Sequence, residues 1–250
     1  MPRVTDTSDG GAFPDPDQAL YARMRWNMPL SAEHAGILLD RLDPRPGQRI
    51  ADLGCGWGEL LLTAVARAGA GAEGTGVDED GSLLERGRRA AERRGLPAEF
   101  LQADAATWRG SADRVLCTGA SHAFGGTAEA LRALARVVPP GGRLLYGDAI
   151  WSQPPSPEAV GLLGEDILSM AGLAEAASAE GWRTIHFSEA DQREWDDFES
   201  TFRAGRAEWL LANPDHPRAA DIREWIEDRE RGYLTVYRGV LGFAYLILAR

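Results

Sequence analysis

Apolar residues along the chain fall into two patterns, short continuous runs and longer stretches that repeat every three or four positions. The first pattern is typical of buried strands and the second of amphipathic helices. Between residues 47 and 150 the two patterns alternate regularly. Strands separated by helices pair in parallel through crossover connections. The pattern therefore predicts an α/β fold, a doubly wound and mostly parallel sheet that binds ligands beyond the carboxyl ends of its strands.

The bounds of the segments follow from this pattern and from the Gly, Pro and capping residues around it. The predicted strands are residues 49–53, 75–78, 99–101, 114–117, 143–146, 184–187 and 240–248. The predicted helical stretches are residues 19–42 with a break at Pro29 and Ser31, 59–68, 83–94 behind a capping box from Ser82 to Glu85, a segment around 131–138, 154–179 and 191–238.

Three parts of the chain differ in composition. Residues 1–18 are rich in Asp, Gly and Pro and have almost no large apolar groups, so we expect a disordered tail. Residues 19–46 should form an N-terminal helical cap. Residues 47–250 should form one Rossmann-like α/β domain, with a helical insertion at 191–238 before the last strand.

Charge and residue types exclude several functions. All 27 basic residues are arginine, which excludes mechanisms that need a lysine, such as P-loop phosphate binding and Schiff-base chemistry. The net charge of −11 disfavours nucleic acids and anionic membranes as partners and leaves a small molecule as the expected substrate. The oligomeric state is not indicated.

Cysteine and histidine placement argues against disulfides and metals. Cys55 and Cys117 lie far apart in apolar runs, and His34, His186 and His216 are scattered along the chain. We therefore expect reduced cysteines and no metal site, while a magnesium ion held by carboxylates stays an open alternative. No targeting or membrane-spanning segment is indicated, so we expect a cytoplasmic protein.

A glycine-rich turn joins the first strand of the α/β region to its first helix. Gly54, Gly56 and Gly58 let the backbone turn tightly and approach a ligand, and the helix N-terminus offers free N–H groups. A dinucleotide fingerprint has the spacing G-x-G-x-x-G, which makes room for a pyrophosphate. Here Glu59 follows Gly58, and no glycine stands at the dinucleotide position. No pyrophosphate is indicated, and a nicotinamide-dependent oxidoreductase remains the alternative enzyme class.

The run from Asp52 to Gly58 resembles motif I of the class I S-adenosylmethionine-dependent methyltransferases. The resemblance covers about residues 47–150 and also implies the sheet order 3-2-1-4-5-7-6, because the last apolar strand is similar to the family's antiparallel seventh strand. Two segments, residues 27–31 and 119–126, resemble a small-molecule subgroup called cyclopropane-synthase-like or methyltransferase-domain proteins. The other matching segments are Val77-Asp78, Gln102-Ala103-Asp104-Ala105, Pro140-Gly141-Gly142 and Gly242-Phe243.

The resemblance implies which residues bind S-adenosylmethionine and its product S-adenosylhomocysteine. Asp52 would help to hold the amino group, Asp78 would accept both ribose hydroxyls, and Asp104 would face the adenine amino group. The other cofactor-binding positions implied by the resemblance are Gly54, Cys55, Gly56, Gly58, Ala105 and Gly119.

Methyl transfer from a sulfonium is an in-line displacement, so the protein must mainly align the acceptor, exclude water and, where needed, remove a proton. His122 is the candidate base, because it follows the fourth strand, where the family places acceptor-facing residues, and imidazole exchanges protons near neutral pH. Asp148, after the fifth strand, is the second candidate. The expected acceptor is an oxygen or nitrogen atom of a small metabolite, and free amines or thiolates need no protein base.

Five aromatic residues are candidates for contact with the acceptor. Trp151 follows the fifth predicted strand, Tyr21 and Trp26 lie in the N-terminal cap, and Trp195 and Tyr237 lie in the insertion. The four rings of the cap and the insertion can form a lid that shields a cationic transition state, or they can simply pack in a core. A protein that binds the cofactor without turnover and acts through partner contacts is a further alternative function.

Overall fold

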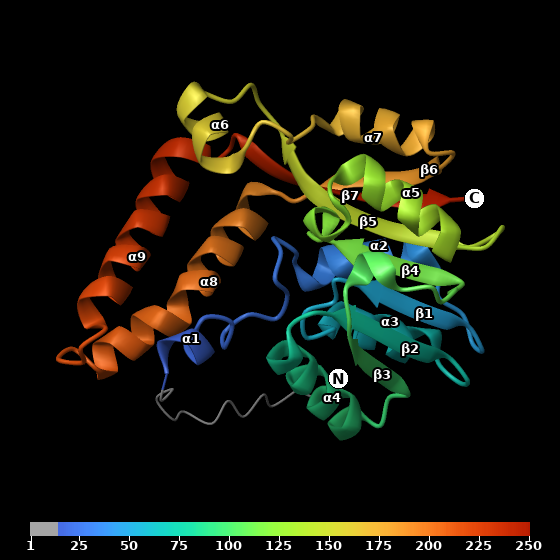
Figure 1. The fold of residues 1–250 in the computed structure, drawn as a ribbon, viewed down its shortest axis with the longest axis horizontal. Helices are drawn as coiled ribbons and strands as arrows, with labels where there is room; N and C mark the ends of the chain where they lie inside the picture. Colours follow the sequence, from blue (N-terminus) through green and yellow to red (C-terminus); the bar gives the residue numbers. More distant parts are fainter. Residues whose placement is uncertain (1–14) are drawn as a thin grey trace.

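The computed structural model of the chain describes residues 15–250, so most of the expected tail, residues 1–18, lies outside the described residues. Seven strands form one sheet in the order β3-β2-β1-β4-β5-β7-β6 (Figure 1). Strands β1 to β5 run parallel, and β7 is antiparallel to both β5 and β6. The predicted fold class and strand order are confirmed. The strands are β1 (Arg49–Leu53), β2 (Glu73–Asp78), β3 (Ala98–Gln102), β4 (Arg114–Thr118), β5 (Arg143–Trp151), β6 (Arg183–Glu189) and β7 (Leu241–Ala249).

Helices flank the sheet and extend beyond it. The α-helices are α1 (Pro16–Ala19), α2 (Ala32–Leu42), α3 (Glu59–Ala68), α4 (Gly81–Arg94), α5 (Thr127–Val137), α6 (Pro157–Leu163), α7 (Met170–Ala179), α8 (Gln192–Ala212) and α9 (Ala219–Gly232). Shorter helical turns are η1 (Ala105–Thr107), η2 (Ser121–Phe124) and η3 (Tyr233–Tyr237). Among residues 15–250, no helix combines the length and the apolar composition that crossing a membrane requires.

Two separate apolar layers cover the faces of the sheet. On one face, α2, α3 and α4 contribute buried residues such as Leu38, Leu61 and Leu84. On the other face, α5 and α7 contribute residues such as Leu134 and Leu173. The carboxyl ends of β1, β2 and β4 therefore meet at one edge between the two layers, where open α/β sheets bind their ligands.

Among the elements that differ from the sequence prediction, one strand is extended by a distant pairing and one helix begins at a local cap. β5 runs on to Trp151, past its predicted end at residue 146, because β7 pairs with it over its whole length. In the predicted helical stretch 19–42, α2 does restart after Ser31, whose hydroxyl accepts the His34 backbone N–H, but residues 20–31 before it contain no α-helix.

Three further helical predictions need correction. The capping residue of α4 is Asp80 rather than Ser82, because the Asp80 side chain accepts the backbone N–H groups of Ser82 and Leu83. The predicted helix 154–179 is divided into α6 and α7, and Gly164 ends α6 with φ of 104°. The predicted stretch 191–238 comprises α8, α9 and the π-helical turn η3.

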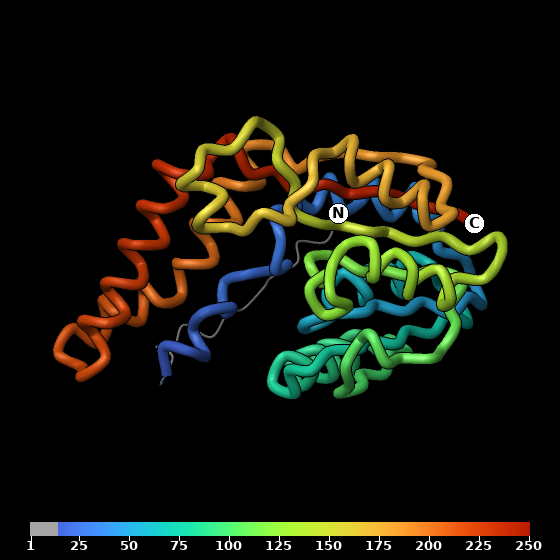
Figure 2. The backbone as a smooth tube through the Cα atoms, turned by 45° about the horizontal axis from the view of Figure 1, so that its top comes forward, coloured from blue at the N-terminus to red at the C-terminus, as the bar shows by residue number. Residues whose placement is uncertain are grey.

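Helices α8 and α9 form an arm that projects beside the sheet, and the N-terminal segment runs from α1 on this arm back toward α2 (Figures 1 and 2). α1 packs closely on α8, since a Cβ on Gly205 would lie 1.9 Å from the Ala19 carbonyl oxygen. Glu199 is wholly buried inside the arm. It accepts two hydrogen bonds from Arg229, at 2.7 and 2.9 Å, and one from the Tyr237 hydroxyl at 3.0 Å. This network fixes α8 to α9 and η3.

Candidate functional site

The glycine-rich turn between β1 and α3 forms the floor of the candidate site. Gly54, Gly56 and Gly58 have φ angles of 77°, 54° and 65°, which side-chain-bearing residues rarely adopt. The backbone N–H groups of Gly54 and Cys55 both donate to the Val77 carbonyl, at 2.9 and 3.0 Å, and so fix the turn to the end of β2. The sequence therefore places an open run of backbone at the carboxyl end of the sheet.

Gly54→Ala should destabilise the fold by about 2–4 kcal/mol. The added Cβ is unfavourable in the left-handed backbone conformation of this residue, and it would also be overpacked against a neighbouring side chain. A Cβ at this position would lie 2.3 Å from the Ala120 Cβ. Chemical denaturation would measure the loss. Gly56→Ala is the matched control, since apart from its chain neighbours no residue lies within 4 Å of the added Cβ, and it should cost only about 1 kcal/mol. Equal losses in the two variants would contradict the steric argument.

Two carboxylates flank the turn, Asp52 near the end of β1 and Asp78 at the end of β2. Asp52 is 4% exposed, and its Oδ1 has no hydrogen-bond partner among the described residues. Burial, reinforced by the nearby charge of Asp78, raises the pKa of Asp52 to about 8. Asp78 accepts the backbone N–H groups of Gly56 and Asp80 at 2.7 and 2.9 Å. An unpartnered buried acceptor of this kind is costly in a free protein, which points to a ligand donor at Asp52.

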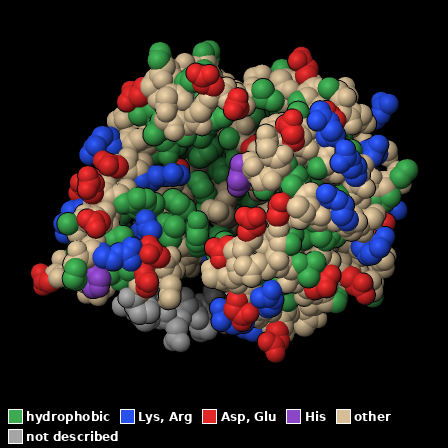
Figure 3. All heavy atoms as spheres, in the orientation of Figure 1, with side chains coloured by type: hydrophobic (Ala, Val, Ile, Leu, Met, Phe, Trp, Pro, Cys, Tyr) green, Lys and Arg blue, Asp and Glu red, His purple; other side chains and the backbone are tan. Residues whose placement is uncertain are grey.

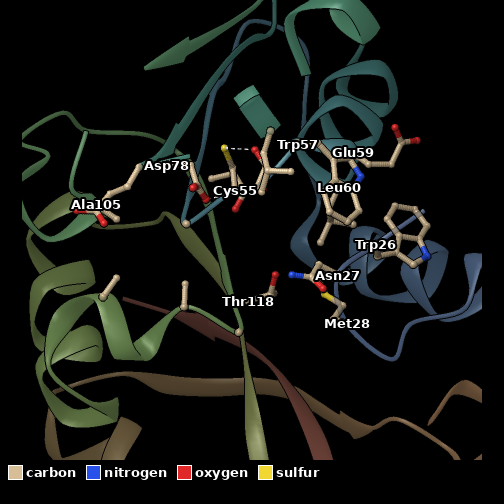
Figure 4. Close-up of a pocket in the computed structure, with 18 of the residues that line it drawn as sticks. Trp26, Asn27, Met28, Cys55, Trp57, Glu59, Leu60, Asp78, Ala105 and Thr118 are labelled. Carbon is tan, nitrogen blue, oxygen red and sulfur yellow. Dashed lines mark hydrogen bonds between the residues drawn. The ribbon is translucent and has the colours of Figure 1, made fainter. Parts of the chain in front are cut away.

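A cavity of about 540 Å³ opens above the turn (Figure 4). Asp104 lies on its lining and caps η1, where its Oδ1 accepts the Ala106 backbone N–H at 2.8 Å. Gly58 is not on the lining; it turns the chain into α3, and a Cβ there would lie 2.4 Å from the Phe100 ring. The cavity brings together the other predicted cofactor residues, which are Asp52, Gly54, Cys55, Gly56, Asp78, Asp104, Ala105 and Gly119.

The opposite wall of the cavity comes from residues 21–31, which we call the strap. Asn27 and Met28 of the strap line the cavity, and Figure 4 shows the Asn27 amide directed toward Thr118 at the end of β4. His122, on η2 after β4, lines the same cavity and is exposed. The candidate base, the strap and the predicted cofactor residues therefore share one space.

Several lining residues had no role in the sequence analysis. Trp57, Leu60 and Leu83 reach the cavity from the turn, α3 and α4, and their apolar character gave no signal beyond helix and core packing. Asn27 lies in a segment that the family resemblance marked without a role. Thr118 directly follows the apolar run of the fourth strand. A polar residue at the end of a strand is the one sequence feature that could have identified it as a site residue.

Asp148 lies away from the cavity. It sits inside β5 opposite Ala244 of β7, and its carboxylate accepts the hydroxyls of Tyr146 at 2.9 Å and Thr127 at 3.3 Å. The expectation that Asp148 and Trp151 follow the fifth strand is wrong, because β5 extends to Trp151. Both residues are therefore part of the sheet rather than of a loop beside the cavity.

The aromatic residues proposed as a lid occupy different places. Trp26 lines the cavity. Tyr21 packs against Trp57, with 5.7 Å between ring centroids. Trp195 and Tyr237 are buried in the apolar layer shared with α2, α3 and α4. Only the strap therefore brings a predicted lid aromatic to the cavity wall, and a lid role for the other three stays a prediction.

Neither cysteine takes part in a disulfide, and burial raises the pKa of both the Cys55 and the Cys117 thiols. Across residues 15–250, no group of three or more His, Cys, Asp or Glu side chains is arranged to hold a metal ion. The polar side chains on the cavity lining therefore include its carboxylates, the Arg25 guanidinium, the Asn27 amide, the Thr118 hydroxyl and the His122 imidazole.

Known proteins resemble this chain over nearly its whole length. A family model described as a methyltransferase domain matches residues 50–142. The Escherichia coli protein YjhP is 33% identical over 236 residues, which cover 90% of this chain and 94% of that protein.

Two crystal structures share the fold of this chain, and both contain the same ligand. They are S-adenosylmethionine-dependent methyltransferases from Geobacter sulfurreducens and Thiobacillus denitrificans, each in complex with S-adenosyl-L-homocysteine. Both superpose with a TM-score of 0.84, at 29% and 30% identity. The matches cover 94% and 96% of this chain and 98% and 100% of the two relatives.

Proposed function

Because the chain belongs to the class I S-adenosylmethionine-dependent methyltransferases, we propose that it methylates an oxygen or nitrogen atom of a small molecule, with His122 as the base. The observation that carries this proposal is the single cavity lined by Asp52, Asp78 and His122. Family membership also replaces the nicotinamide-dependent alternative, in agreement with the glycine spacing of the turn.

The residues of the cavity fit the cofactor. S-adenosylmethionine supplies a methyl group on a positively charged sulfur, which is already activated for displacement. Asp52 would accept a hydrogen bond from the amino group at its unpartnered Oδ1. Asp78 would accept the ribose hydroxyls while it keeps its backbone contact to Gly56, and Asp104 would face the adenine. The carboxylates of Asp52 and Asp78 would also agree in sign with the sulfonium and ammonium groups of the ligand.

The acceptor would lie between the arm and the sheet. Figure 3 shows a hollow there that is lined largely by hydrophobic side chains and has charged groups at its rim. On the arm, the Phe202 ring packs against Tyr21, Phe198 and Trp225, with centroids 5.9, 6.0 and 5.7 Å away. Burying an apolar body against such surfaces would supply binding energy and exclude water. These features support an acceptor with an apolar body and one polar, nucleophilic atom.

Side chains at the cavity end would align that atom and take its proton. His122 would accept the proton that an oxygen or nitrogen acceptor loses on methylation. Asn27 and Thr118 would hold the acceptor by hydrogen bonds, since both line the cavity from opposite walls. Trp26 would help to keep water out of the reacting space.

His122→Ala should lower kcat/KM by about 10²–10⁴-fold, which is the usual contribution of a positioned general base. The dissociation constant for S-adenosylhomocysteine should stay within about threefold, because the residues that would hold the cofactor are untouched. Initial rates with an identified acceptor and calorimetric titration would measure the two quantities. Unchanged turnover in the variant would remove His122 from the mechanism.

The proposal as a whole is tested with a labelled methyl group. We expect micromolar binding of S-adenosylhomocysteine and transfer of label from S-adenosylmethionine to members of a panel of phenols, alcohols and amines with apolar bodies. Binding without transfer to any of them would favour the cofactor-binding, non-catalytic alternative. Absence of binding would contradict the assigned cofactor residues.

A further inference from the structure

The strap is fixed on the side of the cofactor turn by two side chains. The Arg86 guanidinium donates to the carbonyl oxygens of Tyr21 and Met24 at 2.9 and 2.8 Å. The Trp57 indole N–H donates to the Arg25 carbonyl at 2.9 Å, and the Arg86 guanidinium stacks 4.3 Å from the Trp57 ring centroid. This end of the strap is therefore tied to the turn and to α4.

A buried carboxylate from the arm fixes the other end. Glu194, at the start of α8, is 8% exposed and accepts the backbone N–H of Ser31 at 2.7 Å. It also accepts the Asp191 backbone N–H at 3.0 Å and lies 3.1 Å from Nδ1 of His34. Nε2 of His34 lies 2.7 Å from the Ser188 hydroxyl of β6. One carboxylate therefore joins the first turns of α2 and α8 across 163 positions of sequence.

The surroundings of Glu194 favour its charged form. Burial alone would raise the pKa of this carboxyl, but the hydrogen bonds from His34, Ser31 and Asp191 lower it to about 2. Two helix N-termini point their partial positive charges at the same group. Glu194 therefore accepts these hydrogen bonds as a charged carboxylate at neutral pH.

Between the two anchors lie Trp26, Asn27 and Met28, which line the cofactor cavity. The Tyr245 hydroxyl of β7 adds one contact from the sheet, to the Pro29 carbonyl at 2.9 Å. We propose that Glu194 is a positioning residue: by holding Ser31 and His34 it keeps Asn27 and Met28 against the cavity and so sets how fast the cofactor and its product leave. The inference rests on the cofactor site and not on the identity of the acceptor.

The experiment measures release of S-adenosylhomocysteine by stopped-flow displacement, which needs no methyl acceptor. Glu194→Ala should increase the dissociation rate by about tenfold or more, and Glu194→Gln, which keeps one acceptor oxygen, by less. Asp191→Ala is the matched control. It removes the capping side chain that accepts the Glu194 backbone N–H, at a cost of about 1 kcal/mol, and leaves the strap contacts in place. Its dissociation rate should stay within about twofold of the wild-type value.

The NMR chemical shifts of the methionine methyl groups report on the position of the strap, and a general loss of stability would not change one of them selectively. The chain has 4 methionines, of which Met24 and Met28 lie in the strap and Met170 begins α7. In Glu194→Ala the Met28 methyl signal should shift while that of Met170 stays. A folded variant with wild-type release and an unshifted Met28 would overturn the proposal, as would equally fast release in Asp191→Ala. If Glu194→Ala does not fold, wild-type release in Glu194→Gln overturns it.

Discussion

Replacing Asp78 by alanine should weaken S-adenosylhomocysteine binding by about a hundredfold or more. A hydrogen bond to a charged group contributes roughly 1.5–3 kcal/mol, and two ribose hydroxyls would share this carboxylate. The same change removes the acceptor that fixes the Gly56 backbone N–H at 2.7 Å, so the turn itself would lose one of its contacts to β2. Calorimetric titration with S-adenosylhomocysteine at constant pH would measure the loss.

Asp80→Ala is the matched control for Asp78. Asp80 lies two positions further along, and its carboxylate caps α4 through the backbone N–H groups of Ser82 and Leu83, at 2.8 and 3.2 Å. Its removal should cost about 1 kcal/mol of stability and leave the affinity within about threefold. If both variants lost affinity equally, a general loss of negative charge at this edge of the sheet would explain the result. That outcome would contradict a specific role of Asp78 in binding the ribose.

Local sequence patterns predicted most of the sheet but not the parts that distant residues decide. The predicted bounds of β1 and α3 agree with the structure, because apolar spacing and the glycine turn define them locally. The continuation of β5 through Gly147 and Asp148 was not apparent, because small and polar residues do not suggest a strand. It depends on nine residues of β7 that lie far away in sequence.

The candidate site also has one part that local sequence predicts and one part that distant contacts determine. The floor, with Asp52 and Asp78, follows from a contiguous motif whose spacing is fixed by one strand, one turn and one helix. The strap wall depends on the contacts of Arg86 and Glu194 with backbone groups 62 and 163 positions away, and no local pattern encodes these pairs. Asn27 could be noticed in the sequence, but its place beside Thr118 could not.

Asp52 should make cofactor binding depend on pH near neutrality, a range in which an ordinary aspartate is already ionised. Its carboxyl has a pKa of about 8 in the free protein and therefore stays protonated at pH 7. A bound amino group favours the carboxylate, so binding must expel a proton below pH 8. The affinity for S-adenosylhomocysteine should then rise about tenfold per pH unit up to this pH. At still higher pH the affinity should fall again, because the ligand's own α-amino group then loses its proton.

Asp52→Asn separates this linkage from other effects of pH. Titrations in buffers of different ionisation enthalpy should show about one proton released on binding to the wild type at pH 7 and none for the variant. The raised pKa also means that Asp52 contributes stability to the free protein at low pH, which is lost as pH rises through about 8. The variant should therefore be more stable than the wild type at pH 9 while binding more weakly at pH 8. Equal proton release by both proteins would show that the proton comes from another group.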